Sequence, residues 1–373
     1  MSNLLNNKFT LEFLRLVSKE KFKKILIISG NNSFFNSGAK KIITLFSKKK
    51  KIYYFFKKSS LPEINELKKI VIFIEKIKPD LIIAVGGGTV LDYAKIANII
   101  DIKNINNLEK KLKRYITPGD KKNYNLIALP TTAGSGAEVT SNAVIYIDKI
   151  KYSVESQLLL PQYYFLINQL IIKNPIKLKS ASGFDAMSQA IESIISLKSN
   201  SKSLIYAKKS LELSNKNYLK FVKTPNLSNS NNMQLAANLS GKAINISKTT
   251  APHAVSYPFS SIFGVSHGHA VSLTLEKFLL FNFKNIQFSK SDFNLESRYK
   301  IIFKYFKVNN IHDLCLKIKN IKQQANLEDD FKKLDINLNR YIDKILDGIN
   351  LLRVKNNPIQ IKQKDIKKIL TNT

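Results

Sequence analysis

Two segments in the first half of the sequence combine glycine with small hydroxyl residues, a composition that suits a phosphate-containing ligand. The first, 85–89 (VGGGT), follows a short apolar run and begins a helix-like pattern that carries Asp92 and Lys95. Glycine lets the backbone come close to a ligand, and the N–H groups at the start of a helix suit a pyrophosphate. A tight strand-to-helix turn would explain the three glycines equally well, so both interpretations stay open.

The second segment, 130–140 (PTTAGSGAEVT), also follows an apolar run. Its hydroxyl groups offer hydrogen-bond donors to a ligand, whereas the simpler interpretation is a Ser/Gly-rich loop. Two such loops at the ends of two strands of one sheet are what a dinucleotide crevice requires.

The elements that must position these loops alternate between strand-like and helix-like segments. Short apolar runs predict buried strands, and apolar residues at helical spacing predict helices. The expected strands are 24–29, 51–56, 80–85 and 125–129, with helices at 36–46 and 64–78. This alternation predicts an α/β domain built on a parallel, Rossmann-like sheet with helices on both faces.

The pattern changes after about residue 175, beyond which few strand signals remain. Long helical patterns cover 182–197, 201–221, 233–247, 268–281, 297–306 and 333–348. We therefore expect an α/β nucleotide-binding domain over 1–175 and an all-α domain over 176–373.

The formal net charge of +33 raises the question of a nucleic-acid partner. The 60 basic residues are 55 Lys and 5 Arg, and they are spread along the whole chain. Because Arg, which makes bidentate contacts with phosphate and guanine, is scarce, we do not expect such a partner.

Other features bear on the compartment. The single Cys, Cys315, excludes an intrachain disulfide, and no stretch approaches 18 consecutive apolar residues. The segment 1–17 has no uninterrupted apolar core, so it does not read as a signal peptide. We expect a soluble, cytoplasmic protein with no membrane partner.

Four motifs in order connect these observations to a known family. They are 86–95 (GGGTVLDYAK), 130–140, 185–192 (DAMSQAIE) and His267-Gly268. From about Lys24 to its end, the chain resembles an iron-containing (group III) alcohol dehydrogenase. The resemblance implies the two-domain fold described above, NAD(H) or NADP(H) on the sheet domain, a divalent metal such as Fe²⁺ or Zn²⁺ in the cleft against the helical domain, and a homodimer.

In that family one Asp, a His four residues later, and two further His fourteen residues apart hold the metal. Asp185, His253 and His267 match three of these positions, and Gln189 occupies the fourth. Gln189 remains on the same helix face as Asp185, but its amide is neutral. The site would then bind metal more weakly, prefer a different metal, or use three protein ligands plus water.

The resemblance also suggests catalytic and substrate residues. We expect His267 and Tyr257 to take part in catalysis; Tyr257 stands where the family commonly has another His as a proton relay, and it could instead line the pocket. Lys248 and Thr249 precede His253 in a segment that resembles the branch that includes phosphonoacetaldehyde reductases. They could bind an anionic phosphonate or phosphate, or Lys248 could face water.

The coenzyme contacts are expected along the two loops and the first strand. Where the family has an Asp that contacts the adenosine ribose, this chain has Gly30, so no carboxylate opposes a 2′-phosphate and we expect NADP(H) to be accepted. The expected contact residues are Gly30, Gly86, Gly87, Gly88, Thr89, Asp92, Thr131, Thr132, Ser135, Asn142 and Lys151.

These observations predict a metal-dependent, NAD(P)H-linked oxidoreductase that interconverts a small aldehyde and a primary alcohol. An anionic substrate such as phosphonoacetaldehyde is one candidate. Two alternatives stay open. One is a sugar-phosphate dehydrogenase or a dehydroquinate synthase-like lyase of the same fold. The other is a nucleotide- or RNA-binding protein that has lost catalysis.

Overall fold

A computed structural model describes residues 8–19, 21–48, 50–349 and 351–371. The chain divides into two compact units. The first unit consists of the chain up to Asn174 together with Asn226–Gln234, and the second consists of Pro175–Pro225 and the chain from Leu235 onward. In the part that the structure describes, no helix has the length and apolar character needed to cross a membrane.

The first unit is built on a five-stranded sheet in the order β2-β1-β3-β4-β7, in which every pairing is parallel. The four longer strands lie where the sequence predicts them. The apolar side chains of β1, β3 and β4 are buried, whereas those of the edge strand β2 are half-buried or, for Tyr54, exposed. The bounds are β1 (Lys24–Gly30), β2 (Lys51–Lys57), β3 (Leu81–Gly86), β4 (Asn125–Pro130) and β7 (Tyr163–Tyr164). The register pairs Gly86 with Pro130, so the two glycine-containing segments begin at the same edge of the sheet.

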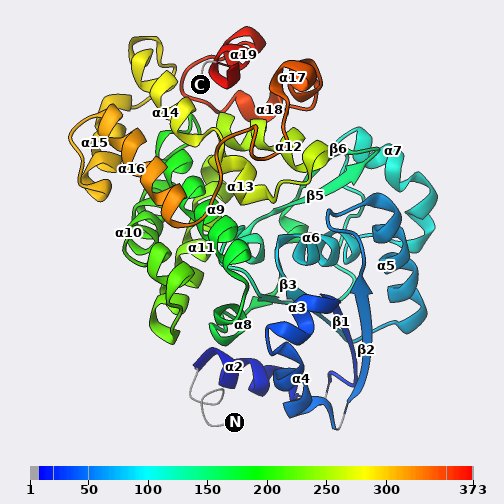
Figure 1. The fold of residues 1–373 in the computed structure, drawn as a ribbon. Helices are drawn as coiled ribbons and strands as arrows, with labels where there is room; N and C mark the ends of the chain where they lie inside the picture. Colours follow the sequence, from blue (N-terminus) through cyan, green and yellow to red (C-terminus); the bar gives the residue numbers. More distant parts are fainter. Residues whose placement is uncertain (1–7, 20, 49, 350, 372–373) are drawn as a thin grey trace. The chain divides into compact units, whose positions relative to one another are not determined.

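Helices cover both faces of this sheet (Figure 1). Leu26 and Ile82 pack with α5 and α6 in one core, whereas Ile25 and Leu81 pack with α2 and α4 in another. Alternating residues of each strand thus serve opposite cores, which explains the continuous apolar runs. The helices are α2 (Lys8–Val17), α3 (Asn31–Asn36), α4 (Ala39–Ser47), α5 (Ile64–Ile77), α6 (Gly88–Ala97), α7 (Leu108–Lys113) and α8 (Gln169–Ile172).

A two-stranded antiparallel hairpin, β5 (Asn142–Ile147) and β6 (Ile150–Glu155), adds to this unit. The sequence patterns did not predict it. Its turn uses Asp148 and Lys149, both with positive φ. Ala143, Ile145 and Ile147 join the same core as α5 and α6, so the hairpin holds a fixed place beside α6.

The second unit is all-helical in the residues described, which confirms the predicted fold class. Its helices are α9 (Ile176–Ile195), α10 (Ser201–Lys223), α11 (Leu227–Ser247), α12 (Ala251–Phe263), α13 (His267–Ser272), α14 (Leu275–Lys284), α15 (Leu295–Phe306), α16 (Ile311–Gln324), α17 (Leu338–Asp347), α18 (Leu351–Val354) and α19 (Gln363–Thr371). The first turns of α11 belong to the first unit.

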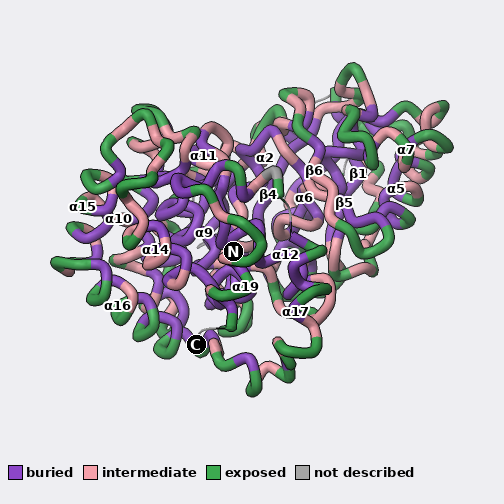
Figure 2. The backbone as a smooth tube through the Cα atoms, turned by 90° about the horizontal axis from the view of Figure 1, so that it is seen from above, coloured by how far each residue is buried: buried purple, intermediate pink, exposed green. Residues whose placement is uncertain are grey.

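Helix α9 is the central element of the second unit and is buried along most of its length (Figure 2). The backbone of α13 approaches it very closely: a Cβ placed on Gly268 would lie 2.0 Å from the carbonyl oxygen of Ala181. Only glycine fits that contact. Gly268 therefore lets the start of α13, and with it His267, come close to α9.

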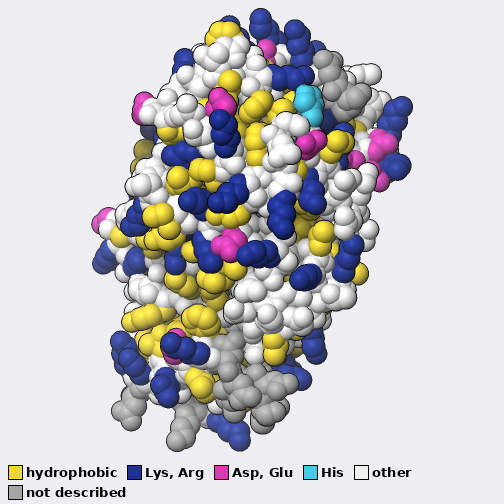
Figure 3. All heavy atoms as spheres, turned by 90° about the vertical axis from the view of Figure 1, so that its left-hand side faces the viewer, with side chains coloured by type: hydrophobic (Ala, Val, Ile, Leu, Met, Phe, Trp, Pro, Cys, Tyr) yellow, Lys and Arg dark blue, Asp and Glu magenta, His cyan; other side chains and the backbone are white. Residues whose placement is uncertain are grey.

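Basic side chains do not form one continuous patch on the face drawn in Figure 3. Lysine and arginine are distributed there among apolar and uncharged groups. A strong nucleic-acid interface usually gathers such charge on one surface, so this face offers no support for that kind of partner.

Candidate functional site

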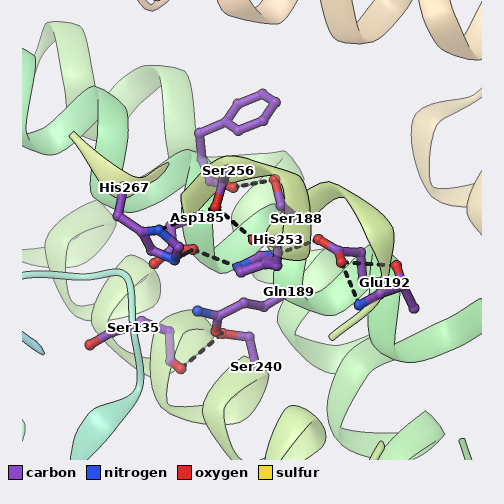
Figure 4. A network of polar contacts seen from close by, with 12 residues as sticks. Ser135, Asp185, Ser188, Gln189, Glu192, Ser240, His253, Ser256 and His267 are labelled. Carbon is purple, nitrogen blue, oxygen red and sulfur yellow. Dashed lines mark hydrogen bonds and ion pairs between the residues drawn. The ribbon is translucent and has the colours of Figure 1, made fainter. Parts of the chain in front are cut away.

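Asp185, His253 and His267 converge in the second unit from three different helices (Figure 4). Nε2 of His253 lies 3.1 Å from Oδ1 of Asp185, and Nε2 of His267 lies 4.0 Å from the same oxygen. One potential ligand atom from each residue lies within 4.8 Å of those of the other two. A carboxylate and two imidazoles at this separation form a donor set suited to a divalent transition metal.

The local sequence explains why these side chains meet. Asp185 projects from the middle of α9, where it is buried. His253 lies in the first turn of α12, which begins after Thr250, and Pro252 suits that first turn. His267 is the first residue of α13, directly before the close contact of Gly268 with α9.

Glu192, two turns after Asp185 on α9, fixes the His253 ring. Its Oε1 contacts Nδ1 of His253, and its Oε2 accepts hydrogen bonds from the backbone N–H of Thr250 at 2.7 Å and the Thr250 hydroxyl at 2.9 Å. Because Nδ1 of the ring is directed at the Glu192 carboxylate, Nε2 is the nitrogen that faces Asp185. A carboxylate behind a ligating imidazole is common around protein-bound metals, where it sets the tautomer and the ring orientation.

The electrostatics of this cluster favour a cation. Burial alone would lower the pKa of His253, but the carboxylates of Glu192 and Asp185 outweigh it and raise that pKa to about 9. Burial alone would raise the pKa of Asp185, yet hydrogen bonding to His253 and the charge of His267 hold it below its usual value. Without a metal, a proton supplies the positive charge; a divalent ion fits the same position.

Gln189, the fourth candidate ligand, lies one turn from Asp185 and is buried. Its Oε1 accepts a hydrogen bond from the Ser240 hydroxyl at 2.9 Å. Asp185 accepts a hydrogen bond from the Gln189 side chain. The amide oxygen is therefore directed toward α11, and the amide nitrogen is on the side of Asp185.

Tyr257 is buried and stacks on His267, with ring centroids 5.8 Å apart and an interplanar angle of 16°. Burial raises the pKa of Tyr257 to about 12, and Glu192 and Asp185 add to the effect while Arg353 opposes it. The phenol is thus protonated at neutral pH and can donate a proton beside the cluster of Asp185, His253 and His267.

The two expected substrate residues lie in the connection between α11 and α12. Lys248 has a left-handed backbone with φ of 60°. Thr249 is buried, and its carbonyl oxygen accepts a hydrogen bond from Nδ2 of Asn356 at 3.2 Å. This bond ties the segment before His253 to the chain that follows α18.

In the first unit, the two glycine-containing loops contact each other at the carboxyl edge of the sheet. A Cβ on Gly87 would lie 3.2 Å from the Thr132 side chain, and one on Gly88 would lie 3.1 Å from Oγ of Ser135. The N–H of Thr131 donates to the carbonyl of Gly86 at 3.0 Å. The start of α6 is therefore lined by backbone and small hydroxyl groups, which suits a pyrophosphate.

Asp92 and Lys95 hold this arrangement together from within. Nζ of Lys95 donates to the carbonyls of Ala137 at 2.9 Å and Asn142 at 2.6 Å, and to Oγ1 of Thr140 at 3.1 Å. Asp92 accepts from the N–H of Val144 at 3.1 Å. Both side chains bind the protein's own backbone, so the structure places them behind the loops.

The remaining expected coenzyme residues are more peripheral to these contacts. Gly30 ends β1, and its carbonyl accepts from Oγ of Ser33 at 2.9 Å. Oγ1 of Thr89, on the first turn of α6, lies 3.4 Å from the carbonyl of Ser60. Lys151 is half-buried on β6.

Three further residues were not singled out from the sequence. Glu192 could have been found, because it shares a helix face with Asp185 two turns away. Ser240 and Arg353 carry no local signal, since each reaches the cluster only through tertiary packing. Arg353, on α18, acts electrostatically on Tyr257, and α18 packs against α12.

Comparisons with known proteins show which family the chain is similar to. Residues 6–167 match the iron-containing alcohol dehydrogenase model, and residues 179–373 match the model of the C-terminal part of the same family. The chain is 28% identical to long-chain-alcohol dehydrogenase 1 of Geobacillus thermodenitrificans over 57% of this chain and 54% of that protein. It is 30% identical to phosphonoacetaldehyde reductase of Streptomyces viridochromogenes over 55% of this chain and 54% of that protein.

Solved structures share the whole fold. A sulfoacetaldehyde reductase from Bifidobacterium kashiwanohense, in complex with NAD⁺, superposes with a TM-score of 0.82 at 24% identity, covering 98% of this chain and 95% of that one. The chain spans only about half the length of the curated relatives that it matches in sequence. The two family models nevertheless cover most of its length, which confirms the resemblance seen in the motifs: the chain belongs to the iron-containing alcohol dehydrogenase family.

Proposed function

We propose that this protein is a metal-dependent, NAD(P)H-linked oxidoreductase that interconverts a small aldehyde and the corresponding primary alcohol. The convergence of Asp185, His253 and His267 carries the proposal, because these side chains form a compact donor set with a proton donor, Tyr257, beside it. The family membership supports the reaction class.

The metal would be held by Asp185, His253 and His267. Bound Fe²⁺ or Zn²⁺ supplies a Lewis acid that polarises a carbonyl oxygen. Glu192 keeps the His253 ring in the orientation that presents Nε2. Tyr257 keeps its phenol proton at neutral pH and delivers it to the alkoxide oxygen of the product. Tyr257, as proton donor, and His267, as metal ligand, would thus be the residues that take part in catalysis.

The coenzyme would bind to the first unit along the start of α6 and the loop 130–140. Backbone N–H groups of the Gly86-Gly87-Gly88 turn and the hydroxyls of Thr89, Thr131, Thr132 and Ser135 face its phosphates. Reduced nicotinamide supplies the hydride. The relatives include proteins named NAD-dependent methanol dehydrogenase and NADPH-dependent butanol dehydrogenase; Gly30, which offers no carboxylate against a 2′-phosphate, favours acceptance of NADPH here.

The substrate would be an aldehyde that carries an anionic group. Two of the related proteins are named as reductases of phosphonoacetaldehyde and sulfoacetaldehyde. Arg353, half-buried near Tyr257, supplies positive charge close to the metal cluster. Lys248 and Thr249 lie just before the N-terminus of α12, which carries His253, and they add a further cation and a hydroxyl there. A guanidinium is well suited to bind a phosphonate, sulfonate or carboxylate.

We also propose a cytoplasmic homodimer. The family resemblance suggests the dimer, and the use of one cysteine in 373 residues suits a reducing compartment. Size-exclusion chromatography with light scattering tests the oligomeric state.

An aldehyde panel tests the function most broadly. The purified protein, loaded with Fe²⁺ or Zn²⁺, is assayed for oxidation of NADH and NADPH with phosphonoacetaldehyde, propanal and butanal. We expect turnover that depends on aldehyde and metal, with the anionic aldehyde preferred. The proposal would be contradicted if the metal-loaded protein turned over neither coenzyme with any aldehyde or alcohol.

A further inference from the structure

We propose that Gln189 is not a metal ligand. It acts as a hydrogen-bond donor that holds Asp185, so that only Asp185, His253 and His267 bind the ion and its remaining coordination positions are open to water and substrate. This inference rests on the proposed function only in assuming that the cluster binds a divalent metal.

The orientation of the amide carries the argument. Of the two polar ends of Gln189, only the oxygen could bind a cation, and this oxygen accepts the hydrogen bond from Ser240 at 2.9 Å. Figure 4 shows the nitrogen on the side of Asp185 and the oxygen on the side of Ser240. Asp185 accepts from the Gln189 side chain, so the amide end that faces the ion position is a donor.

The reverse orientation is less favourable on electrostatic grounds. The Ser240 hydroxyl also lies 2.9 Å from the carbonyl of Ala237, so it could donate there and accept from a rotated amide. Rotation of the Gln189 amide would, however, remove a charge-assisted hydrogen bond to Asp185. It would place Oε1 of Gln189 against the Asp185 carboxylate, where the two oxygens repel each other. Asp185 stays ionised when it binds a metal, so the same preference persists in the loaded protein.

The donor set that remains has a recognisable chemical character. Two imidazoles and one carboxylate are the protein ligands of several catalytic zinc sites and of iron sites with open positions. Such a site binds its ion less tightly than one with four protein ligands, but leaves room for a carbonyl oxygen. An amide in place of an imidazole at residue 189 thus lowers the affinity for the metal and leaves one more coordination position open.

Cobalt binding tests the inference without relying on activity. Metal-free wild-type protein and the Gln189→Leu, Gln189→His and Gln323→Leu variants are titrated with Co²⁺, and the dissociation constant and visible absorption bands are measured. Gln323, which is exposed, is the control for the Gln-to-Leu change. Gln189→Leu should weaken binding about tenfold, as loss of a group behind a ligand does, without moving the bands. Gln189→His should tighten binding about tenfold or more and shift the bands.

Different results separate the possible failures. If wild-type protein binds no Co²⁺, the metal-dependent function itself is wrong. If it binds Co²⁺ but Gln189→Leu shifts the bands or abolishes binding, only the inference about Gln189 is overturned. Should the Leu variant not fold, a crystal structure of the Zn²⁺-loaded wild-type protein decides: an ion within about 2.2 Å of Oε1 of Gln189 is a ligated ion and contradicts the inference, whereas a separation above about 3 Å supports it.

Discussion

The carboxylate of Glu192 contacts Nδ1 of His253, and Oδ1 of Asp185 lies 3.1 Å from Nε2 of the same ring. One imidazole is thus held between two buried carboxylates that come from a single face of α9. In the proposed site the two carboxylates would have different roles: Asp185 would bind the metal, whereas Glu192 would orient the His253 ring that binds it.

Glu192→Gln should therefore weaken metal binding without removing a ligand. The amide can still bond to Thr250, but it no longer holds Nδ1 of His253 with a full charge. We expect a metal dissociation constant that is about 10- to 100-fold higher, measured by Zn²⁺ competition with a chromophoric chelator. Glu296→Gln, on the exposed surface of α15, is the control. Unchanged affinity in Glu192→Gln would show that the contact has no role in metal binding.

Lys95→Met should impair coenzyme binding through the loop that Lys95 holds. Removal of the ammonium takes away the donor that three oxygens share and leaves the partly buried Asp92 beside an apolar chain. Breaking such a buried pair typically costs about 3–5 kcal/mol in the free energy of unfolding.

The Lys95→Met measurement has two parts. Urea unfolding reports stability, and quenching of intrinsic tyrosine fluorescence reports NADPH affinity. Lys103→Met, which changes an exposed lysine, is the control. A stable variant with wild-type coenzyme affinity would show that the loop does not bind the coenzyme.

Arg353→Met should change substrate preference more than general activity. We expect kcat/KM for phosphonoacetaldehyde to fall about tenfold or more, because a charged hydrogen bond is worth roughly 1.5–3 kcal/mol, whereas kcat/KM for propanal stays within about twofold. Arg340→Met on α17 provides a matched control, since that guanidinium lies against the Tyr341 ring. Equal losses for both aldehydes would contradict a role in recognising the anionic group.

Much of the fold follows from local patterns in the sequence. The four longer strands are short apolar runs, and three of them, β1, β3 and β4, end in glycine or proline, a simple signal that locates them well. The hairpin β5–β6 was missed because its turn, Asp148-Lys149, lacks the glycine that commonly marks such a turn. Helix α12 was missed because Pro252 and Pro258 argue against a helix, although Pro252 lies in its first turn and α12 still runs through Pro258.

The site shows the same limit of local reasoning. The resemblance to the iron-containing alcohol dehydrogenases indicated Asp185, His253 and His267 as metal ligands, and the structure brings these side chains together. The orientation of Gln189 could not be predicted, because it depends on Ser240 of α11, which is 51 residues away in sequence. The charge near Tyr257 likewise depends on the packing of α18 against α12, which no periodicity reveals.

Lys277 gives a prediction for the pH dependence of stability. Burial lowers the pKa of Lys277 to about 8, and its ammonium lies 5.1 Å from the centroid of the Phe331 ring. An unfolded lysine titrates near 10.4. Between pH 8 and about 10.4 the unfolded chain binds more protons, so this group makes the free energy of unfolding rise with pH.

Lys277→Met removes that dependence. The variant should be more stable than wild type at pH 7, where the buried ammonium is charged, and the difference should shrink at pH 9.5. Urea unfolding at both pH values measures it, with Lys300→Met as an exposed control. A difference that does not change with pH would contradict the lowered pKa.

We expect aldehyde reduction by this protein to depend on a metal held by Asp185, His253 and His267. The most direct measurement follows aldehyde-dependent NADPH oxidation by chelator-treated wild-type protein and the His267→Ala variant, before and after addition of Fe²⁺ or Zn²⁺. We predict that wild-type activity disappears on chelation and returns with metal, and that the variant is inactive throughout. Undiminished activity in the metal-free protein or in His267→Ala would contradict the account.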